Sequence, residues 1–82
     1  MNTSIVNEES FDVKVLMGQT NYSFSIYPTY DKNNDARFIV GLDGVDIGEI
    51  GVNERFDWEW KDGGLNGTSA SEIGSKIEAH YD

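Results

Sequence analysis

The sequence contains no cysteine and one proline, and only six of its 82 residues are basic. Without cysteine there is no disulfide, no thiolate zinc site and no cysteine nucleophile, so stability has to come from apolar packing. No apolar run reaches the roughly 18 residues of a membrane-spanning helix. The first residues, MNTSIVNEES, lack the basic and apolar segments of a signal peptide. We therefore expect a cytoplasmic protein with no membrane partner.

The shortage of positive charge is the strongest compositional feature. Fifteen acidic residues against six basic ones give a formal net charge of -9. Such a field repels the phosphates of nucleic acids and anionic membrane surfaces. We therefore expect no direct nucleic-acid binding. The same acidity also has a simpler interpretation, because net charge keeps a small protein in solution.

A chain of this length forms one domain with a thin core, since it buries only a little over 60% of the surface that its unfolded form exposes. A thin core leaves little stability for a strained catalytic cleft. His80 is the only histidine, and no serine or carboxylate is spaced to form a triad with it. The sequence therefore predicts no enzyme, no catalytic residue and no cofactor.

One segment has the spacing of a calcium ligand loop. Asp31, Asn33 and Asp35 match the first, third and fifth positions of an EF-hand. The sixth position, which requires glycine, is Ala36, and the twelfth, which requires glutamate, is Leu42. We therefore interpret the segment as a polar hairpin loop and predict no metal site.

Hydrophobic residues alternate with polar ones along most of the chain, which is typical of strands with one buried face. Asp43-Gly44 is a strong hairpin signal, because both residues can adopt positive φ. The alternation in the fourth segment stays in phase only if one residue is skipped, which predicts a β-bulge at Gly48-Glu49. The expected strands span residues 11–17, 22–27, 37–43, 45–52 and 56–61.

A helix is expected at the C-terminal end. Ser69 followed by Glu72 forms a capping box, and an apolar stripe at helical spacing comes next. The stripe consists of Ala70, Ile73, Ile77 and Tyr81. The sequence thus predicts a flexible arm over residues 1–10 and one α+β domain over residues 11–82. Its fold is an antiparallel meander of about five strands with one C-terminal helix packed on one face.

Three apolar side chains are expected on the outward side of the sheet: Leu16, Tyr27 and Ile39. If they lie on neighbouring strands they form a contact patch. The first functional hypothesis is therefore a non-enzymatic binding or accessory domain that holds a protein partner there, as a monomer or a weak homodimer.

Trp58 and Trp60 continue the inward alternation as core residues, or else anchor a partner at an interface.

The second hypothesis rests on acidic residues that are concentrated between positions 43 and 62. If the last two strands pair, several of these carboxylates share one surface. Such a surface suits an acidic inhibitor that mimics nucleic acid and blocks the basic groove of a nucleic-acid-binding target. The predicted acidic face consists of Asp43, Asp46, Glu49, Glu54, Asp57, Glu59 and Asp62.

Overall fold

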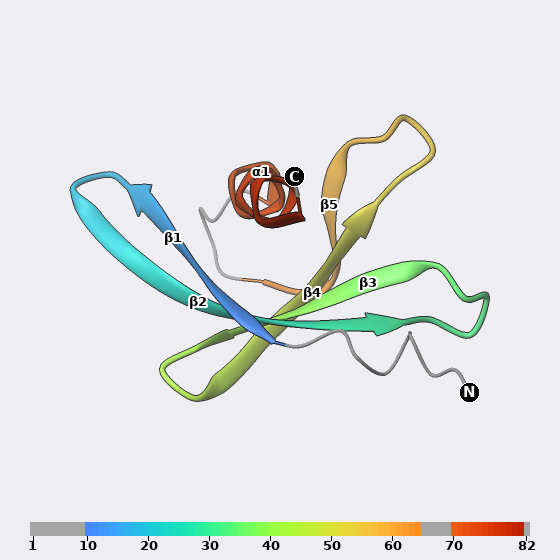
Figure 1. Ribbon diagram of the computed structural model, residues 1–82, viewed down its shortest axis with the longest axis horizontal. Coiled ribbons are helices and arrows are strands. Elements are labelled where there is room, and N and C mark those ends of the chain that lie inside the picture. Colours follow the sequence, from blue (N-terminus) through green and yellow to red (C-terminus); the bar gives the residue numbers. More distant parts are fainter. Residues whose placement is uncertain (1–9, 65–69, 82) are drawn as a thin grey trace.

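A computed structural model describes residues 10–64 and 70–81, which form a five-stranded antiparallel sheet with one helix packed against it (Figure 1). The sheet order is β1-β2-β3-β4-β5, so every strand pairs with its neighbours in sequence. The predicted meander with a C-terminal helix is confirmed. The elements are β1 (Phe11–Met17), β2 (Thr20–Tyr30), β3 (Ala36–Leu42), β4 (Val45–Val52), β5 (Trp58–Gly63) and α1 (Ala70–Tyr81).

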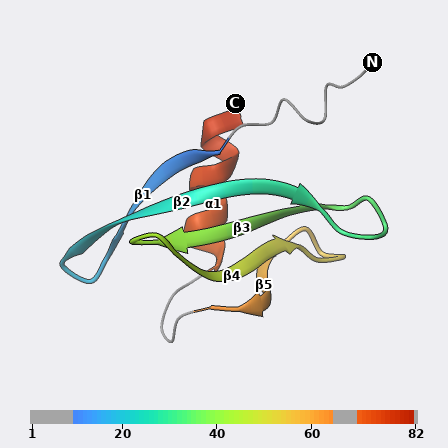
Figure 2. The same ribbon diagram turned by 90° about the horizontal axis from the view of Figure 1, so that it is seen from below.

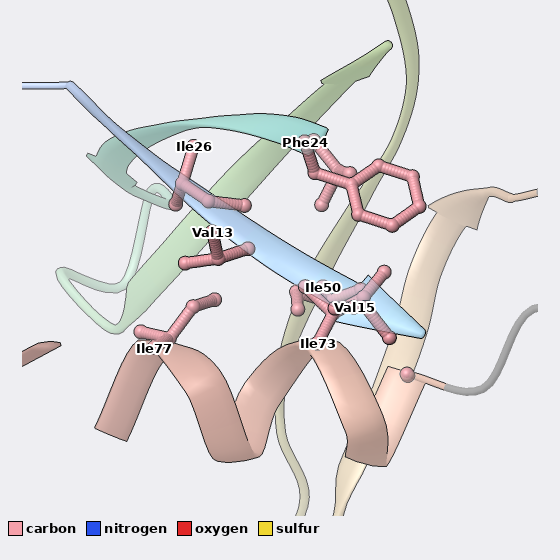
Figure 3. Close-up of a cluster of buried hydrophobic side chains, with 9 residues drawn as sticks. Val13, Val15, Phe24, Ile26, Ile50, Ile73 and Ile77 are labelled. Atoms are coloured by element: carbon pink, nitrogen blue, oxygen red, sulfur yellow. The ribbon is translucent and has the colours of Figure 1, made fainter. Parts of the chain in front are cut away.

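The core lies between the sheet and α1. Figure 3 shows side chains of β1, β2 and β4 pointing toward Ile73 and Ile77 of the helix. Complete burial of one such side chain stabilises a fold by about 1.5–3 kcal/mol. The buried apolar residues of the described chain are Val13, Val15, Phe24, Ile26, Val40, Ile50, Ala70, Ile73 and Ile77.

Two hairpins close with two-residue turns. Asp43 and Gly44 have φ of 53° and 82°. These are the positive values that the Asp-Gly signal predicts for a tight turn between twisted strands. β2 continues through Pro28 to Tyr30, where it pairs with β3 only, since its pairing with β1 ends at Ile26. Pro28 therefore lies at an edge of the ladder, as its missing amide requires.

The irregularity in β4 lies close to its predicted place. Val40 pairs with Gly48 and Gly41 pairs with Asp46, so the skipped residue is Ile47 rather than Gly48 or Glu49. Gly48 is instead the point where β5 comes closest. A Cβ atom on it would lie 2.7 Å from the backbone oxygen of Asp62. The skip keeps Ile50 in phase with the core, where it is fully buried.

The predicted start of the fifth strand is wrong. Phe56 was expected to begin the strand with its side chain inward, but β5 begins at Trp58. Phe56 lies in the preceding turn with φ of 66° and is 85% exposed. Hydrogen bonds of Asn53 to the backbone of Asp57 close that turn before the strand can start.

The helix packs through the predicted stripe, of which Tyr81 is the exception at 53% exposed. Gly74 is also buried, because α1 lies against the indole of Trp58. A Cβ atom at position 74 would lie 2.1 Å from Cγ of that indole. Figure 2 shows α1 behind one face of the sheet. Ser69 of the predicted capping box and residues 1–9 of the predicted arm lie outside the described residues.

Candidate functional site

The sheet face opposite α1 is the candidate site, because no segment within residues 10–64 and 70–81 covers it (Figure 2). Cross-strand pairing fixes which side chains share this face. Tyr27 pairs with Ile39, Ile39 with Glu49, and Glu49 with Asp62. One continuous row therefore crosses four strands on the uncovered side.

The centre of this face is apolar. Tyr27 is 44% exposed and lies directly opposite the partly buried Ile39. The Tyr27 ring passes close to Gly41, with its Cε2 atom 3.7 Å from where a Cβ of that glycine would lie. A shallow hollow of about 290 Å³ opens beside Ile39, and the side chains of Asp46, Glu49 and Asp62 are among its lining. Apolar and acidic groups thus meet at one place.

Leu16 does not join this patch. It pairs with Asn21 near the turn between β1 and β2, whereas Tyr27 lies six residues further along β2. At about 3.3 Å per residue that separation is roughly 20 Å. Leu16 is 60% exposed and lines a groove beside Ser71 and Ser75 of α1. The structure therefore brings together two of the three predicted contact residues.

Ion pairs neutralise part of the open face. Arg37 contacts Asp31 at 2.8 Å and Glu49 at 3.3 Å. Lys61 contacts Glu59 at 2.8 Å, and the amide of Asn53 donates to the same carboxylate at 3.0 Å. The Lys61 hydrogen bond is the main cause that lowers the pKa of Glu59.

The seven predicted acidic residues fall into three places. Asp43 lies in the turn between β3 and β4, while Glu54 and Asp57 lie in the turn at the opposite end of β4. The other four belong to β4 and β5, where Glu49 and Glu59 are paired with cations. Asp46 and Asp62 form no ion pair with any described residue. These two are the unneutralised carboxylates beside Ile39.

The two tryptophans are packed against the core. Both are partly buried, and the ring of Trp58 lies 5.7 Å from that of Phe38. The Trp58 indole also donates to Glu78 of α1 at 2.9 Å. Both therefore belong to the face that α1 covers, away from Tyr27 and Ile39.

Two matching turns lie at one end of the sheet. The predicted hairpin loop at 31–35 is confirmed, whereas the turn at 53–57 and its likeness to the first were not predicted. Asp31 begins the turn between β2 and β3, and its Oδ1 accepts from the amides of Asn33 and Asp35 at 2.8 and 2.9 Å. Asn53 begins the turn between β4 and β5, and its Oδ1 accepts from Arg55 and Asp57 at 2.8 and 3.1 Å. Each has Asp or Asn at the first position and Asp four residues later, which is the signal that could have found them.

A cleft separates these two turns. Pairing between β3 and β4 ends at Phe38 and Ile50, although both outer hairpins continue further. Figure 1 shows the hairpins diverging beyond this point. On one side the cleft holds about 490 Å³, with Arg37, Arg55 and Lys61 among its lining. On the other it holds about 480 Å³, with Phe38 and Phe56 among its lining.

The Asp31 carboxylate is fully engaged by the protein. Its Oδ1 accepts two backbone amides and its Oδ2 pairs with Arg37. The hydrogen bond from the Asp35 amide is the main cause that lowers the pKa of Asp31.

No three His, Asp or Glu residues of the described chain are grouped to hold a metal ion. His80 stacks on the ring of Phe11, with ring centroids 3.7 Å apart.

No family model, curated protein or solved structure matches the chain. Within residues 10–64 and 70–81, no helix is long and apolar enough to cross a membrane. Any functional conclusion therefore rests on the residues of this chain.

Proposed function

We propose that the chain is a small, non-enzymatic, cytoplasmic protein-binding domain whose open sheet face binds a partner with a basic surface. The observation that carries this proposal is the Tyr27–Ile39 pair on the uncovered face beside Asp46 and Asp62, in which Tyr27 is exposed and Ile39 is partly buried. An apolar centre with a charged rim is the usual composition of a protein interface. Asp46 and Asp62, which form no ion pair within residues 10–64 and 70–81, and the net charge of -9 favour a basic partner.

The test is a comparison of charge substitutions inside and outside this patch. Ile39→Lys and Tyr27→Lys should remove partner binding, because each puts a charged group in the apolar contact, and a cation there also repels a basic partner. Leu16→Lys is the matched control, since it changes an exposed apolar residue roughly 20 Å away. Each tagged variant is used to capture partners from lysate of the source organism, and the bound proteins are compared. Equal capture by the Ile39→Lys and wild-type proteins would contradict the proposal.

The basic nature of the partner has a separate test. Asp46→Asn with Asp62→Asn removes two negative charges and leaves the shape of the face unchanged. The captured partner should bind this variant more weakly in low salt, and the difference should shrink in high salt because of screening. A partner whose affinity is unchanged by the double substitution would not be held by these carboxylates.

The nucleic-acid mimic is the alternative proposal. The net charge and the shared position of Asp46 and Asp62 support it. It is the weaker of the two, because Glu49 and Glu59 are already neutralised and the other three residues lie at opposite ends of β4. A captured nucleic-acid-binding protein that DNA or RNA displaces from the bait would favour the mimic over the apolar contact.

A further inference from the structure

The two matching turns differ at their fourth position, and this difference points to a second surface. Both turns use the same backbone closure: the amide of the fourth residue donates to the first carbonyl at 2.9 Å. Both place the fourth residue at positive φ, 69° for Asn34 and 66° for Phe56. Asparagine is among the residues that tolerate this conformation, whereas a bulky aromatic is an outlier there.

The Phe56 side chain packs little against the described part of its own chain. It is 85% exposed, and its ring contacts no other aromatic ring of the described residues. Asparagine could occupy position 56, as Asn34 occupies the same position in the matching turn. A single exposed apolar side chain is ordinary, but Phe56 also holds an unfavourable backbone conformation, and this combination points to a contact outside the chain.

A receptor for such a ring lies beside it. The cleft between the diverging hairpins holds about 480 Å³ on this side, and its apolar lining includes Ala36, Phe38 and Val52. Phe56 stands at its margin. A projecting ring and an apolar cleft are thus neighbours on one surface. That is the arrangement that a two-fold contact uses, because each copy then offers both parts to the other.

The charges around the cleft show the same self-complementarity. Arg55 carries a cation with no ion pair among the described residues, and Asp35 and Glu54 carry anions with none. All three side chains are exposed; Asp35 and Glu54 line both sides of the cleft, and Arg55 lines the side away from Phe56. A two-fold contact would let Arg55 of one copy approach Asp35 or Glu54 of the other, because these two carboxylates border both sides of the cleft.

We propose that this end of the sheet is a self-association surface, in which Phe56 of each copy inserts into the cleft of a second copy beside Ala36 and Val52. The contact is small and forms a weak, reversible dimer. Because each copy carries a net charge of -9, long-range repulsion opposes the dimer, and moderate salt strengthens it by screening. The surface is separate from the Tyr27–Ile39 patch, so a partner and a second copy can bind together.

Analytical ultracentrifugation of the purified protein tests this, from about 1 μM to about 1 mM and at low and moderate salt. The wild-type protein should dimerise with rising concentration, more strongly at moderate salt. Phe56→Asn should lower the association constant at least about tenfold, a change worth about 1.4 kcal/mol. Leu16→Asn, which removes an exposed apolar residue elsewhere, should leave it unchanged.

A charge exchange makes the test independent of Phe56. Arg55→Glu should weaken the dimer, and adding Glu54→Arg to it should recover much of the wild-type association, since the net charge of -9 is restored and each new cation again meets a new anion. Circular dichroism confirms that the variants fold. A wild-type protein that stays monomeric over the whole range would overturn the proposal. So would a dimer that Tyr27→Lys abolishes and Phe56→Asn does not, and that result would leave the open-face proposal standing.

Discussion

At the scale of single residues, position 56 is one where a substitution should stabilise the protein rather than destabilise it. Phe56→Asn should raise the free energy of unfolding by about 1 kcal/mol, because a bulky residue in the left-handed region costs roughly 1–2 kcal/mol and asparagine tolerates it. The midpoint of thermal unfolding should rise by roughly 4–8 °C for a domain of this size. The measurement is made on dilute, monomeric protein.

The matched turn supplies the opposite substitution as a control. Asn34→Phe should destabilise the protein by a similar amount, since it puts an aromatic residue at φ of 69°. If Phe56→Asn lowered stability instead, the Phe56 ring would have contacts within the chain that its 85% exposure does not suggest.

Asp31 should make stability depend on pH. Hydrogen bonds from the Asp35 and Asn33 amides and the charge of Arg37 lower its pKa in the folded protein. A carboxyl with a lowered pKa contributes stability above its unfolded value of about 3.9, and that contribution is lost as pH falls through the folded value. In urea unfolding between pH 7 and pH 2.5, Asp31→Asn should show a smaller loss below about pH 4 than the wild type. Parallel curves for the two proteins would mean that this carboxyl is not responsible.

At the scale of elements, Gly74 shows packing acting against helix propensity. Alanine is favoured over glycine in a helix by about 1 kcal/mol. Gly74→Ala should nevertheless destabilise the protein by about 1–3 kcal/mol, because the new methyl group overlaps the Trp58 indole. Ser75→Ala, on the exposed side of α1, is the control and should be neutral or slightly stabilising. Chemical denaturation measures both, and a stabilised Gly74→Ala variant would mean that Trp58 can move aside.

Strand positions followed from periodicity where turn residues bound them. The predicted spans 11–17 and 45–52 match β1 and β4, and residues 37–43 match β3 to within one residue. The start of β5 could not be found in this way, because Phe56 has the same parity as Trp58 and extends the alternation without a break. The hydrogen bonds of Asn53 decide the boundary, and these depend on a turn conformation that alternation does not reveal.

The sequence also predicted only part of the candidate site: which residues share a face, but not where along the sheet they lie. Alternation correctly indicated that Tyr27 and Ile39 share a face, but it cannot place residues along the sheet. Only the register shows that these two are opposite each other, while Leu16 in β1 pairs with Asn21 near the start of β2. The cleft was not predictable, because it results from β3 and β4 separating beyond Phe38 and Ile50.

At the scale of the whole molecule, net charge should make stability depend on salt. A charge of -9 on 82 residues destabilises the compact state through self-repulsion. At pH 7, added sodium chloride should therefore raise the midpoint of urea unfolding, since screening weakens the repulsion. Near the pI of about 4.3 the effect should largely vanish. Urea is used because guanidinium would itself screen the charges. A midpoint that falls with salt at pH 7 would mean that the internal ion pairs outweigh the repulsion.

The separation of β3 and β4 also bears on how the molecule moves. Beyond Phe38 and Ile50 the two hairpins are free of ladder hydrogen bonds to each other, and the Arg37–Glu49 contact at 3.3 Å bridges them. A partly exposed ion pair of that length contributes little rigidity. Beyond that point the two hairpins are joined through side chains rather than through the ladder, so a small change in sheet twist would alter the width of the opening between their tips. Because Phe56 lies in the turn between β4 and β5, the same change in twist would also move its ring relative to the β2–β3 turn.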